Sequence, residues 1–172
     1  MDYKTKRGGE MDKRLNTNEL RQEIRTFLNE NNLASLATCG NSIPRCSPVQ
    51  YFTGDNMDIY VISSGGEKFN NIQDNPNVCL LVNTDYVDYK KIKGVQVFGK
   101  AHTSLKHPHF IDEAKKHAPY EQMLAIEKDW INIIKIVPDE IVYLDALNGD
   151  RTKQVLKNDQ VIEMQDRVLS IH

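Results

Sequence analysis

The spacing of apolar residues predicts an amphipathic helix near the start of the chain. Residues 17–30 carry one apolar stripe at helical spacing, with polar residues between its members. The stripe consists of Leu20, Ile24, Phe27 and Leu28. Asn16 is a good N-cap residue, and Glu19 three positions later completes the sequence pattern of a capping box. We therefore expect a helix that begins after Asn16 and packs its stripe onto a core.

From residue 33 the pattern changes to short apolar runs separated by Gly, Asn, Asp and Pro, which is typical of strands joined by turns. The runs lie at 33–38, 43–52, 59–62, 78–82, 94–103, 131–137, 140–147, 152–157 and 161–164. We expect the first four to form an antiparallel meander. Helical spacing recurs at 67–74 and at 108–127, where Pro119 interrupts it. Together these elements predict a mainly β (α+β) fold, a small closed or nearly closed antiparallel barrel with flanking helices.

Prolines and glycines mark expected irregularities in these strands. Pro44 and Pro48 lack an amide hydrogen, so we expect their strand to lie near an edge or a bulge. Gly99 predicts a bulge or bend within 94–103. Pro138-Asp139 is expected to separate two strands, and Asn148-Gly149 predicts a hairpin turn.

Candidate chemistry is concentrated in the turn between the strand at 59–62 and the helix at 67–74. The turn residues are Ser63, Ser64, Gly65 and Gly66, and Lys68 follows one turn into the helix. The free amide groups of a helix N-terminus attract anions, and two hydroxyls and a cation add to that attraction. The turn therefore suits a phosphate group. An ordinary loop before a capped helix remains the alternative, because short Ser/Gly turns are common.

Length and composition limit the classes of function. At 172 residues the chain is long enough for one domain, which we assign to 16–172, behind a disordered N-terminal tail at 1–15 in which Met11 is an alternative start. A formal net charge of −2 gives no support for nucleic-acid binding. No apolar stretch suggests a membrane span or secretory signal, so we expect a cytoplasmic protein. Its three cysteines, never in a C-x-x-C pair, are expected to be reduced thiols.

The order of these motifs resembles the FMN-binding split β-barrel family related to pyridoxamine 5′-phosphate oxidase. The segments that carry the resemblance are PRCSPVQYF at 44–52, YVISSGGEKFNNIQDNPNVCLLV at 60–82 and GVQVFGKA at 94–101. They cover the central half of the chain, and weaker similarity continues through IIKIVPDEIVYLDAL at 133–147. The resemblance implies a split β-barrel that forms a homodimer with FMN at the subunit interface.

The resemblance also implies roles for single residues. Arg45 would place its guanidinium on the FMN phosphate, and Lys68 falls on the phosphate lysine of the family. Ile62 and Ser63 fall where family members contact the flavin and phosphate, and Gln96 would reach the ring from the neighbouring subunit. The segment expected to offer backbone groups to the isoalloxazine edge comprises Cys46, Ser47, Pro48, Val49 and Gln50. The phosphate site that the turn suggests coincides with the family's phosphate site.

Three departures from the family pattern concern the second phosphate cation, the interface glutamine and the substrate pocket. Glu67 stands where many members carry Arg beside the lysine. The family's glutamine at the start of the long strand aligns with Gly94, so Gln96 is a substitute on the same face. Where the family has its C-terminal Arg-x-His substrate signature, this chain has Arg151-Thr152-Lys153, and where the family has an aromatic residue upstream, it has Leu144. Oxidation of pyridoxine 5′-phosphate is therefore not implied.

Other residues have both a functional and a structural interpretation. One residue of the group His102, His107 and His109 is a candidate iron or haem ligand, since related barrels include haem-binding and haem-degrading members, but surface-loop histidines are more common. Cys46 beside Arg45 is either a thiol of lowered pKa or a small packed residue. Trp130 is either a cover for the flavin or a core or interface anchor. Tyr86 and Tyr89 are candidates for the pocket mouth.

Two classes of function follow. The first is a flavin-dependent oxidoreductase that reduces an unidentified small molecule with electrons from NADH or NADPH, in which the cofactor carries the hydride chemistry. The second is a non-catalytic flavin or haem carrier or sensor, or a haem-degrading protein, on the same barrel. No Ser/His/Asp order suggests a hydrolase.

Overall fold

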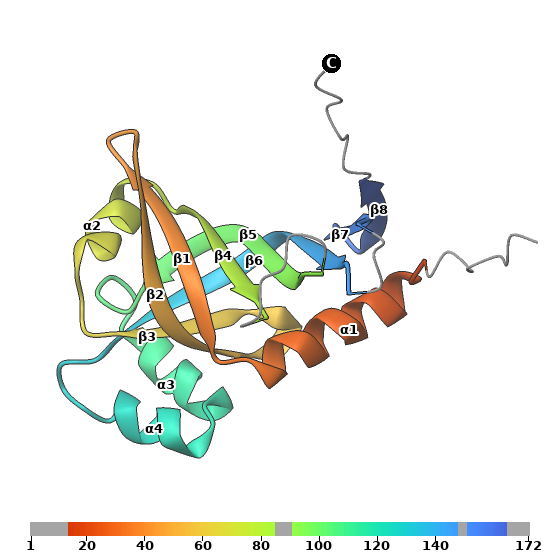
Figure 1. Cartoon of the computed structure of the whole chain (residues 1–172). Coiled ribbons are helices and arrows are strands. Elements are labelled where there is room, and N and C mark those ends of the chain that lie inside the picture. The colour runs from red at the N-terminus through yellow and green to blue at the C-terminus, as the bar shows by residue number, and fades with distance from the viewer. Residues whose placement is uncertain (1–13, 85–90, 148–150, 165–172) are drawn as a thin grey trace, which may run out of the picture.

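The computed structural model describes residues 14–84, 91–147 and 151–164, which form one eight-stranded antiparallel sheet with four helices (Figure 1). The helices are α1 (Thr17–Glu30), α2 (Glu67–Asp74), α3 (His109–His117) and α4 (Tyr120–Ile126). The strands are β1 (Leu33–Gly40), β2 (Ile43–Thr53), β3 (Ile59–Ser63), β4 (Asn77–Asn83), β5 (Lys93–Thr103), β6 (Asn132–Asp145), β7 (Lys153–Lys157) and β8 (Gln160–Met164).

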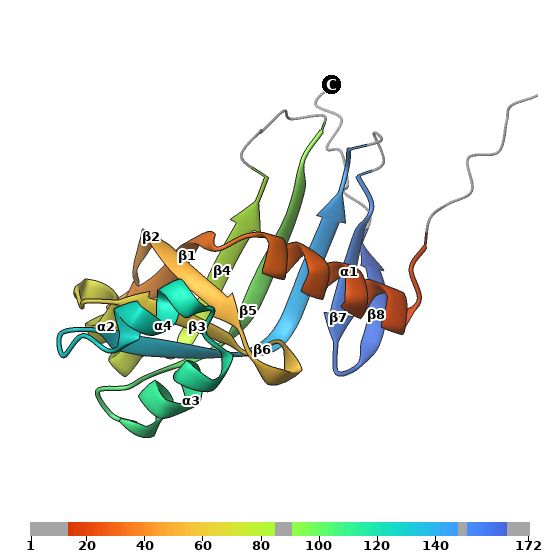
Figure 2. The same cartoon turned by 90° about the horizontal axis from the view of Figure 1, so that it is seen from below.

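Six of the strands close into a barrel. The order in the sheet is β3-β2-β1-β4-β5-β6-β7-β8, and an additional pairing between β3 and β6 joins its first strand to its sixth. β7 and β8 continue the sheet beyond the barrel, beside β6 (Figure 2). The predicted mainly β fold with flanking helices, a split β-barrel, is confirmed.

The predicted four-strand meander is wrong in its last strand. β1, β2 and β3 form a meander, but β4 pairs with β1 and not with β3. The reason is α2, which carries the chain from the end of β3 across the barrel end, so that β4 enters the sheet on the far side of β1 (Figure 1).

The two strands predicted on either side of Pro138-Asp139 are one continuous strand, β6. The pairing of β5 with β6 shifts register at Phe98 and Gly99, where Phe98 faces Glu140 and Gly99 faces Pro138. Asp139 is therefore the extra residue of a bulge, a position at which a strand tolerates a proline. The bulge predicted at Gly99 is confirmed, but it accommodates Pro138 instead of ending the strand.

β2 accommodates its prolines because half of it has only one strand partner. The whole of β1 pairs with the part of β2 from Ile43 to Gln50, whereas β3 pairs only with the part of β2 from Gln50 to Thr53. Pro44 and Pro48 thus lie in a segment with one free edge among the described residues, as the sequence predicted.

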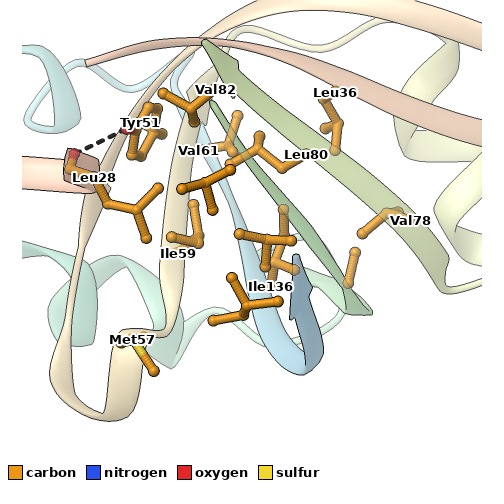
Figure 3. Packing of buried hydrophobic residues seen from close by; sticks show 14 of the residues in the cluster. Leu28, Leu36, Tyr51, Met57, Ile59, Val61, Val78, Leu80, Val82 and Ile136 are labelled. Atoms are coloured by element: carbon orange, nitrogen blue, oxygen red, sulfur yellow. Dashed lines mark hydrogen bonds between the residues drawn. The ribbon is translucent and has the colours of Figure 1, made fainter. Parts of the chain in front are cut away.

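The barrel interior is filled by large aliphatic side chains (Figure 3). Leu36, Leu80, Ile136 and Val61 are fully buried there, and Met57 is buried in the same cluster. Tyr51 donates a hydrogen bond from its hydroxyl to the Leu28 carbonyl oxygen at 2.8 Å, which ties α1 to β2. The predicted stripe of α1 is buried in the same core. The predicted capping box at Asn16 and Glu19 is also present.

Helices α3 and α4 cover the outer side of β3 and β6 (Figures 1 and 2). A second apolar cluster forms there from Phe52, Tyr60, Ala114, Ile126 and Ile133. The predicted interruption near Pro119 separates the two helices. No helix in the described ranges is long and apolar enough to cross a membrane. The hairpin turn predicted at Asn148-Gly149 and the candidate pocket residues Tyr86 and Tyr89 lie outside the described residues, as do residues 1–13 of the predicted tail.

Candidate functional site

The turn from β3 into α2 is built on two glycines. Gly65 has φ 136° and Gly66 has φ 102°, in the left-handed region that favours glycine. The Ser63 hydroxyl accepts a hydrogen bond from the Gly65 amide at 3.3 Å and donates one to the Gly65 carbonyl oxygen at 3.2 Å. A Cβ added at Gly65 would meet no atom within 4 Å. The turn is therefore held by Ser63 and open on the side of Gly65.

Lys68 folds back over this turn. Its Nζ donates a hydrogen bond to the Gly65 carbonyl oxygen at 2.7 Å, and its side chain is half-buried. It also lies 5.9 Å from the ring centre of Phe69. An ammonium group has three donors, and this hydrogen bond uses one. A cation thus stands fixed at the entrance of α2, as the sequence predicted.

The first turn of α2 carries no capping side chain. Gly66 is its N-cap and offers none, and the only amide hydrogen bond back to Gly66 in the described turn comes from Phe69. Uncapped amide groups at a helix N-terminus are donors for an anion. Glu67 is the one acidic residue of this turn, and its carboxylate competes with an anion for the same end of the helix.

α2 is fixed to the barrel by a buried polar contact that the sequence did not indicate. Asn71 donates a hydrogen bond from its side-chain amide to the Thr38 hydroxyl at 3.0 Å, and both residues are buried. A Cβ added at Gly40 would clash with the Asn71 side chain, so α2 packs directly over the end of β1. In the sequence, the contact could be inferred only if the Asn within the helix were already known to lie beside the Thr of the strand. Neither residue is unusual when it is considered alone.

Arg45 lies on β2 opposite Thr38 of β1. Residues directly opposite each other share a face of the sheet, so Arg45 is on the same face as the Thr38–Asn71 contact that anchors α2. The side chain of Arg45 is exposed. The strand therefore carries a second cation toward the end of the barrel on which α2 sits.

The segment from Cys46 to Gln50 alternates between the two faces of β2. Ser47 and Val49 lie opposite Leu36 and Ala34 and face the interior, whereas the other three face outward. Those three are Cys46, Pro48 and Gln50. Because β3 begins to pair only at Gln50, the backbone of this segment has no strand partner on its β3 side among the described residues. Along that free edge, backbone amide and carbonyl groups are available to form hydrogen bonds with a ligand.

Ile62 and Trp130 flank the turn. Ile62 pairs with Gln50 of β2 on one side and Ile133 of β6 on the other. Trp130 comes two residues before Asn132, which pairs with Ser63, and its side chain is 58% exposed. Ser64, next along the turn, is exposed. The structure thus brings Trp130 to the same end of β3 as the serines.

Gln96 lies apart from this group. It pairs with Leu81 of β4 and Val142 of β6, and it is separated from β2 by β1 and β4. On the other side of the closed barrel, Val142 lies far along β6 from Ile133, which pairs with Ile62 next to the turn. At about 3.3 Å per residue, this separates Gln96 from the turn by roughly 30 Å along the strand. Within one chain, therefore, Gln96 does not join the turn that holds Lys68.

The middle of the outer side of β2, β1, β4 and β5 is uncharged, a feature that the sequence analysis missed, and the exposed Lys100 continues the outward row of β5 beyond Phe98. The outward side chains alternate with buried ones along the strands. Those in the uncharged middle are Pro44, Cys46, Pro48 and Gln50; Leu33, Ser35, Ala37 and Cys39; Cys79 and Leu81; and Gln96 and Phe98. We call this set the outer face. Its exposed apolar members include Leu33 at 63%, Leu81 at 37% and Phe98 at 37%.

A second polar network fixes α3 beside β3. Lys135 forms ion pairs with Asp58 at 3.0 Å and with Glu113 at 2.5 Å, and Tyr60 donates a hydrogen bond to Glu113 at 2.5 Å. Burial opposes the charge of Lys135, but its hydrogen bonds to both carboxylates outweigh burial and raise its pKa. Hydrogen bonds from Lys135 and then Tyr60 lower the pKa of Glu113, against the effect of burial. The network supports the strand that ends in the candidate turn.

We expect Glu113→Gln to reduce stability in a pH-dependent way. At pH 7 the loss should be about 1–2 kcal/mol, since one charged hydrogen bond is weakened while Asp58 still pairs with Lys135. The folded-state pKa of Glu113 lies below its ordinary value of 4.5, so its contribution is complete above about pH 4.5 and is lost as the pH falls through the folded pKa. Urea unfolding from pH 7 to pH 3 measures the difference from wild type, with the exposed Glu121→Gln as control. A difference that stays constant across that range would contradict the assignment.

The site as a whole can bind an anion next to a flat apolar group. Its donors are the Lys68 ammonium and uncapped amides of α2, and Ile62 and Trp130 supply apolar surface nearby. Among the described residues, no group of three or more His, Cys, Asp or Glu side chains is placed to hold a metal ion.

Comparisons with known proteins identify the family and the fold. The family model described as pyridoxamine 5′-phosphate oxidase matches residues 20–164. No curated protein matches the chain significantly. A solved structure of a putative pyridoxamine 5′-phosphate oxidase from Listeria innocua has a TM-score of 0.54 at 22% identity, over 73% of this chain and 98% of that one.

Two further solved structures share the fold at lower identity. ChuZ from Campylobacter jejuni has a TM-score of 0.66 at 17% identity, over 88% of this chain and 64% of that one. A heme binding protein from Mycobacterium smegmatis has a TM-score of 0.60 at 15% identity, over 88% of this chain and 59% of that one. Identities this low establish the fold alone. With a family model that spans most of the chain and a closed six-stranded barrel, the protein belongs to the pyridoxamine 5′-phosphate oxidase family of split β-barrels.

Proposed function

We propose that the chain binds FMN, with the phosphate in the turn between β3 and α2. The observation that carries this proposal is the geometry of that turn: an uncapped helix N-terminus, two glycines with positive φ and the Lys68 ammonium fixed over them. Fixed amide donors and a cation together suit a phosphate. The open side at Gly65 leaves space for one.

In this proposal each predicted residue has a distinct task. Lys68 and Arg45 bind the phosphate, and the Ser63 hydroxyl holds the turn in shape while Ser64 offers a second hydroxyl. Ile62 and the free edge of Cys46–Gln50 contact the ring, and Trp130 covers it. Bound FMN would supply the hydride chemistry. The residues of the chain bind and orient it.

We further propose a homodimer that forms through the outer face. A sheet face whose middle is uncharged and carries exposed leucine and phenylalanine side chains is typical of an interface. A two-fold contact would bury it and would bring Gln96 of one subunit toward the flavin of the other, which explains why Gln96 lies apart from the turn within one chain. The site is then complete only in the dimer.

A charge in the outer face should separate the subunits. Leu81 lies near the middle of the face, between Ser35 and Gln96. We expect Leu81→Glu to give a solution mass of one chain and to weaken FMN binding at least about tenfold, because two facing carboxylates would be buried at the contact. Light scattering after size exclusion measures the mass, with Tyr120→Glu, exposed on α4, as control. A wild-type mass of one chain at micromolar concentration would count against the dimer.

With FMN bound, we propose that the protein is an oxidoreductase that accepts electrons from NADH or NADPH and passes them to a small molecule. Anaerobic stopped-flow mixing of the FMN-loaded protein with each nucleotide tests this step. Bleaching of the flavin band within seconds supports an enzyme. A band unchanged by both nucleotides would show a flavin carrier or sensor instead.

A haem-binding function is the second candidate, favoured by one group of side chains. The imidazole rings of His102, His107 and His109 gather around Phe110, with ring centres 5.8 and 5.9 Å apart along the group. A structural neighbour carries the name heme binding protein. Titration with hemin distinguishes the candidates. A shift of the Soret band that His107→Ala abolishes supports haem binding, whereas a Soret band that does not shift on addition of the protein contradicts it.

A further inference from the structure

A cavity of about 260 Å³ lies between the last turn of α2 and the loop that follows β5. It is separate from the candidate FMN site, because it involves the opposite end of α2 from Lys68. Neither the family match nor the proposed FMN site gives it a role, and of the candidate haem group only His102 and His107 line it. Its chemistry differs from that of the outer face, because most of its polar side chains carry or can accept positive charge.

The cavity has an apolar floor and a basic rim. Ile72, Pro76 and Ala101 supply the apolar surface. The ionisable lining residues are His102, Lys106 and His107, and none of the eight lining residues is acidic. Lysine and protonated histidine donate charged hydrogen bonds to carboxylates and phosphates. The lining is therefore complementary to a small molecule with an anionic head and a short apolar body.

Both walls of the cavity are held by the barrel. Ser104, buried in the loop, donates its amide hydrogen bond to the Ile133 carbonyl oxygen at 2.8 Å and accepts one from the Ile133 amide at 3.0 Å. On the opposite wall, the Ala101 amide of β5 donates a hydrogen bond to the carbonyl oxygen of Pro76, just after α2, at 2.8 Å. The basic side chains thus project from a rigid frame, which is typical of ligand sites.

We propose that this cavity binds a small organic anion, a carboxylate or a phosphate monoester, through Lys106, His102 and His107. The volume limits the ligand to a few tens of atoms at most and is too small to enclose a porphyrin. The proposal does not depend on FMN binding, because the two sites share no residue.

Imidazole resonances of the purified full-length protein report on the site directly. The probes are benzoate, phenyl phosphate and the neutral benzyl alcohol, and His102→Gln and His107→Gln assign the resonances. We expect benzoate or phenyl phosphate to shift both resonances saturably below about 10 mM, and benzyl alcohol to shift neither. The anion that binds more tightly identifies the head group. The ring of His117, the last residue of α3, stacks on Tyr60 with ring centres 5.8 Å apart and should not respond.

Lys106→Ala should weaken anion binding about fivefold or more, because it removes one charged hydrogen bond. Lys116→Ala, on the exposed side of α3, should leave it unchanged. Equal shifts with benzyl alcohol, unchanged affinity in Lys106→Ala, or no saturable shift with either anion would overturn the proposal. A phosphate that binds only at the α2 N-terminus would leave the His102 and His107 resonances unmoved and is thereby distinguished.

Discussion

Lys68→Ala should weaken FMN binding about ten- to a hundredfold and leave riboflavin binding almost unchanged. The Lys68 ammonium is half-buried and fixed 2.7 Å from the Gly65 carbonyl oxygen, at the mouth of an uncapped helix. A charged hydrogen bond of this kind contributes on the order of 1.5–3 kcal/mol, and each 1.4 kcal/mol is about tenfold in affinity. Riboflavin lacks the phosphate and has nothing for Lys68 to bind. Because Glu67 stands where many relatives carry a second cation, the loss should be larger here than in those relatives.

Fluorescence quenching in flavin titrations of the apoprotein measures both affinities. Lys68→Arg keeps the cation and should therefore retain most of the FMN affinity that Lys68→Ala loses. If the lysine stem acted only through packing, the arginine variant would not be expected to retain that affinity. If Lys68 were only a solvated helix residue, the alanine variant would lose less than about half a kcal/mol of stability and no affinity. Equal losses for FMN and riboflavin would show that Lys68 acts on folding or on the ring, and the phosphate assignment would fail.

Gly99→Ala should be strongly destabilising, by about 3 kcal/mol. A Cβ at Gly99 would lie well under 3.0 Å from the Val137 carbonyl oxygen, and Pro138 stands directly opposite. The clash is with backbone atoms, so no side-chain movement relieves it, and overpacking of this kind costs about 1–3 kcal/mol or more. For a domain of this size, the expected loss lowers the thermal midpoint by about 6–12 °C.

Gly94→Ala on the same strand is the matched control. Its Cβ would lie 3.1 Å from the Val82 carbonyl oxygen, a tight contact that a small shift relieves. We therefore expect a loss of less than about 1 kcal/mol there. Thermal unfolding followed by circular dichroism compares the two variants. Similar midpoints for both would mean that the bulge is not a fixed part of the barrel.

The sequence predicted those parts of the fold that local patterns determine. The buried stripe of α1, the Ser/Gly turn, the helix at 67–74 and the interruption at Pro119 are all present in the structure. Strand pairing is different, because nothing local states which strands lie side by side. The predicted meander is therefore wrong at β4, and the break predicted at Pro138 is wrong because the Gly99 bulge accommodates this proline.

The candidate site was predictable to a similar extent. The turn and Lys68 are close in sequence, and the structure brings them together as predicted. The Asn71–Thr38 contact and the outer face depend on packing between distant segments, and no spacing in the sequence reveals them. The roles of Arg45, Gln96 and Trp130 toward FMN stay predictions, because they depend on a ligand and a second subunit.

The absorption spectrum of the protein, purified by size exclusion after incubation with FMN, tests the central claim most directly. We expect the two visible bands of oxidised flavin to co-elute with the protein at about one flavin per chain, since each subunit contributes one phosphate turn. Protein that elutes without flavin bands would contradict the proposed FMN site.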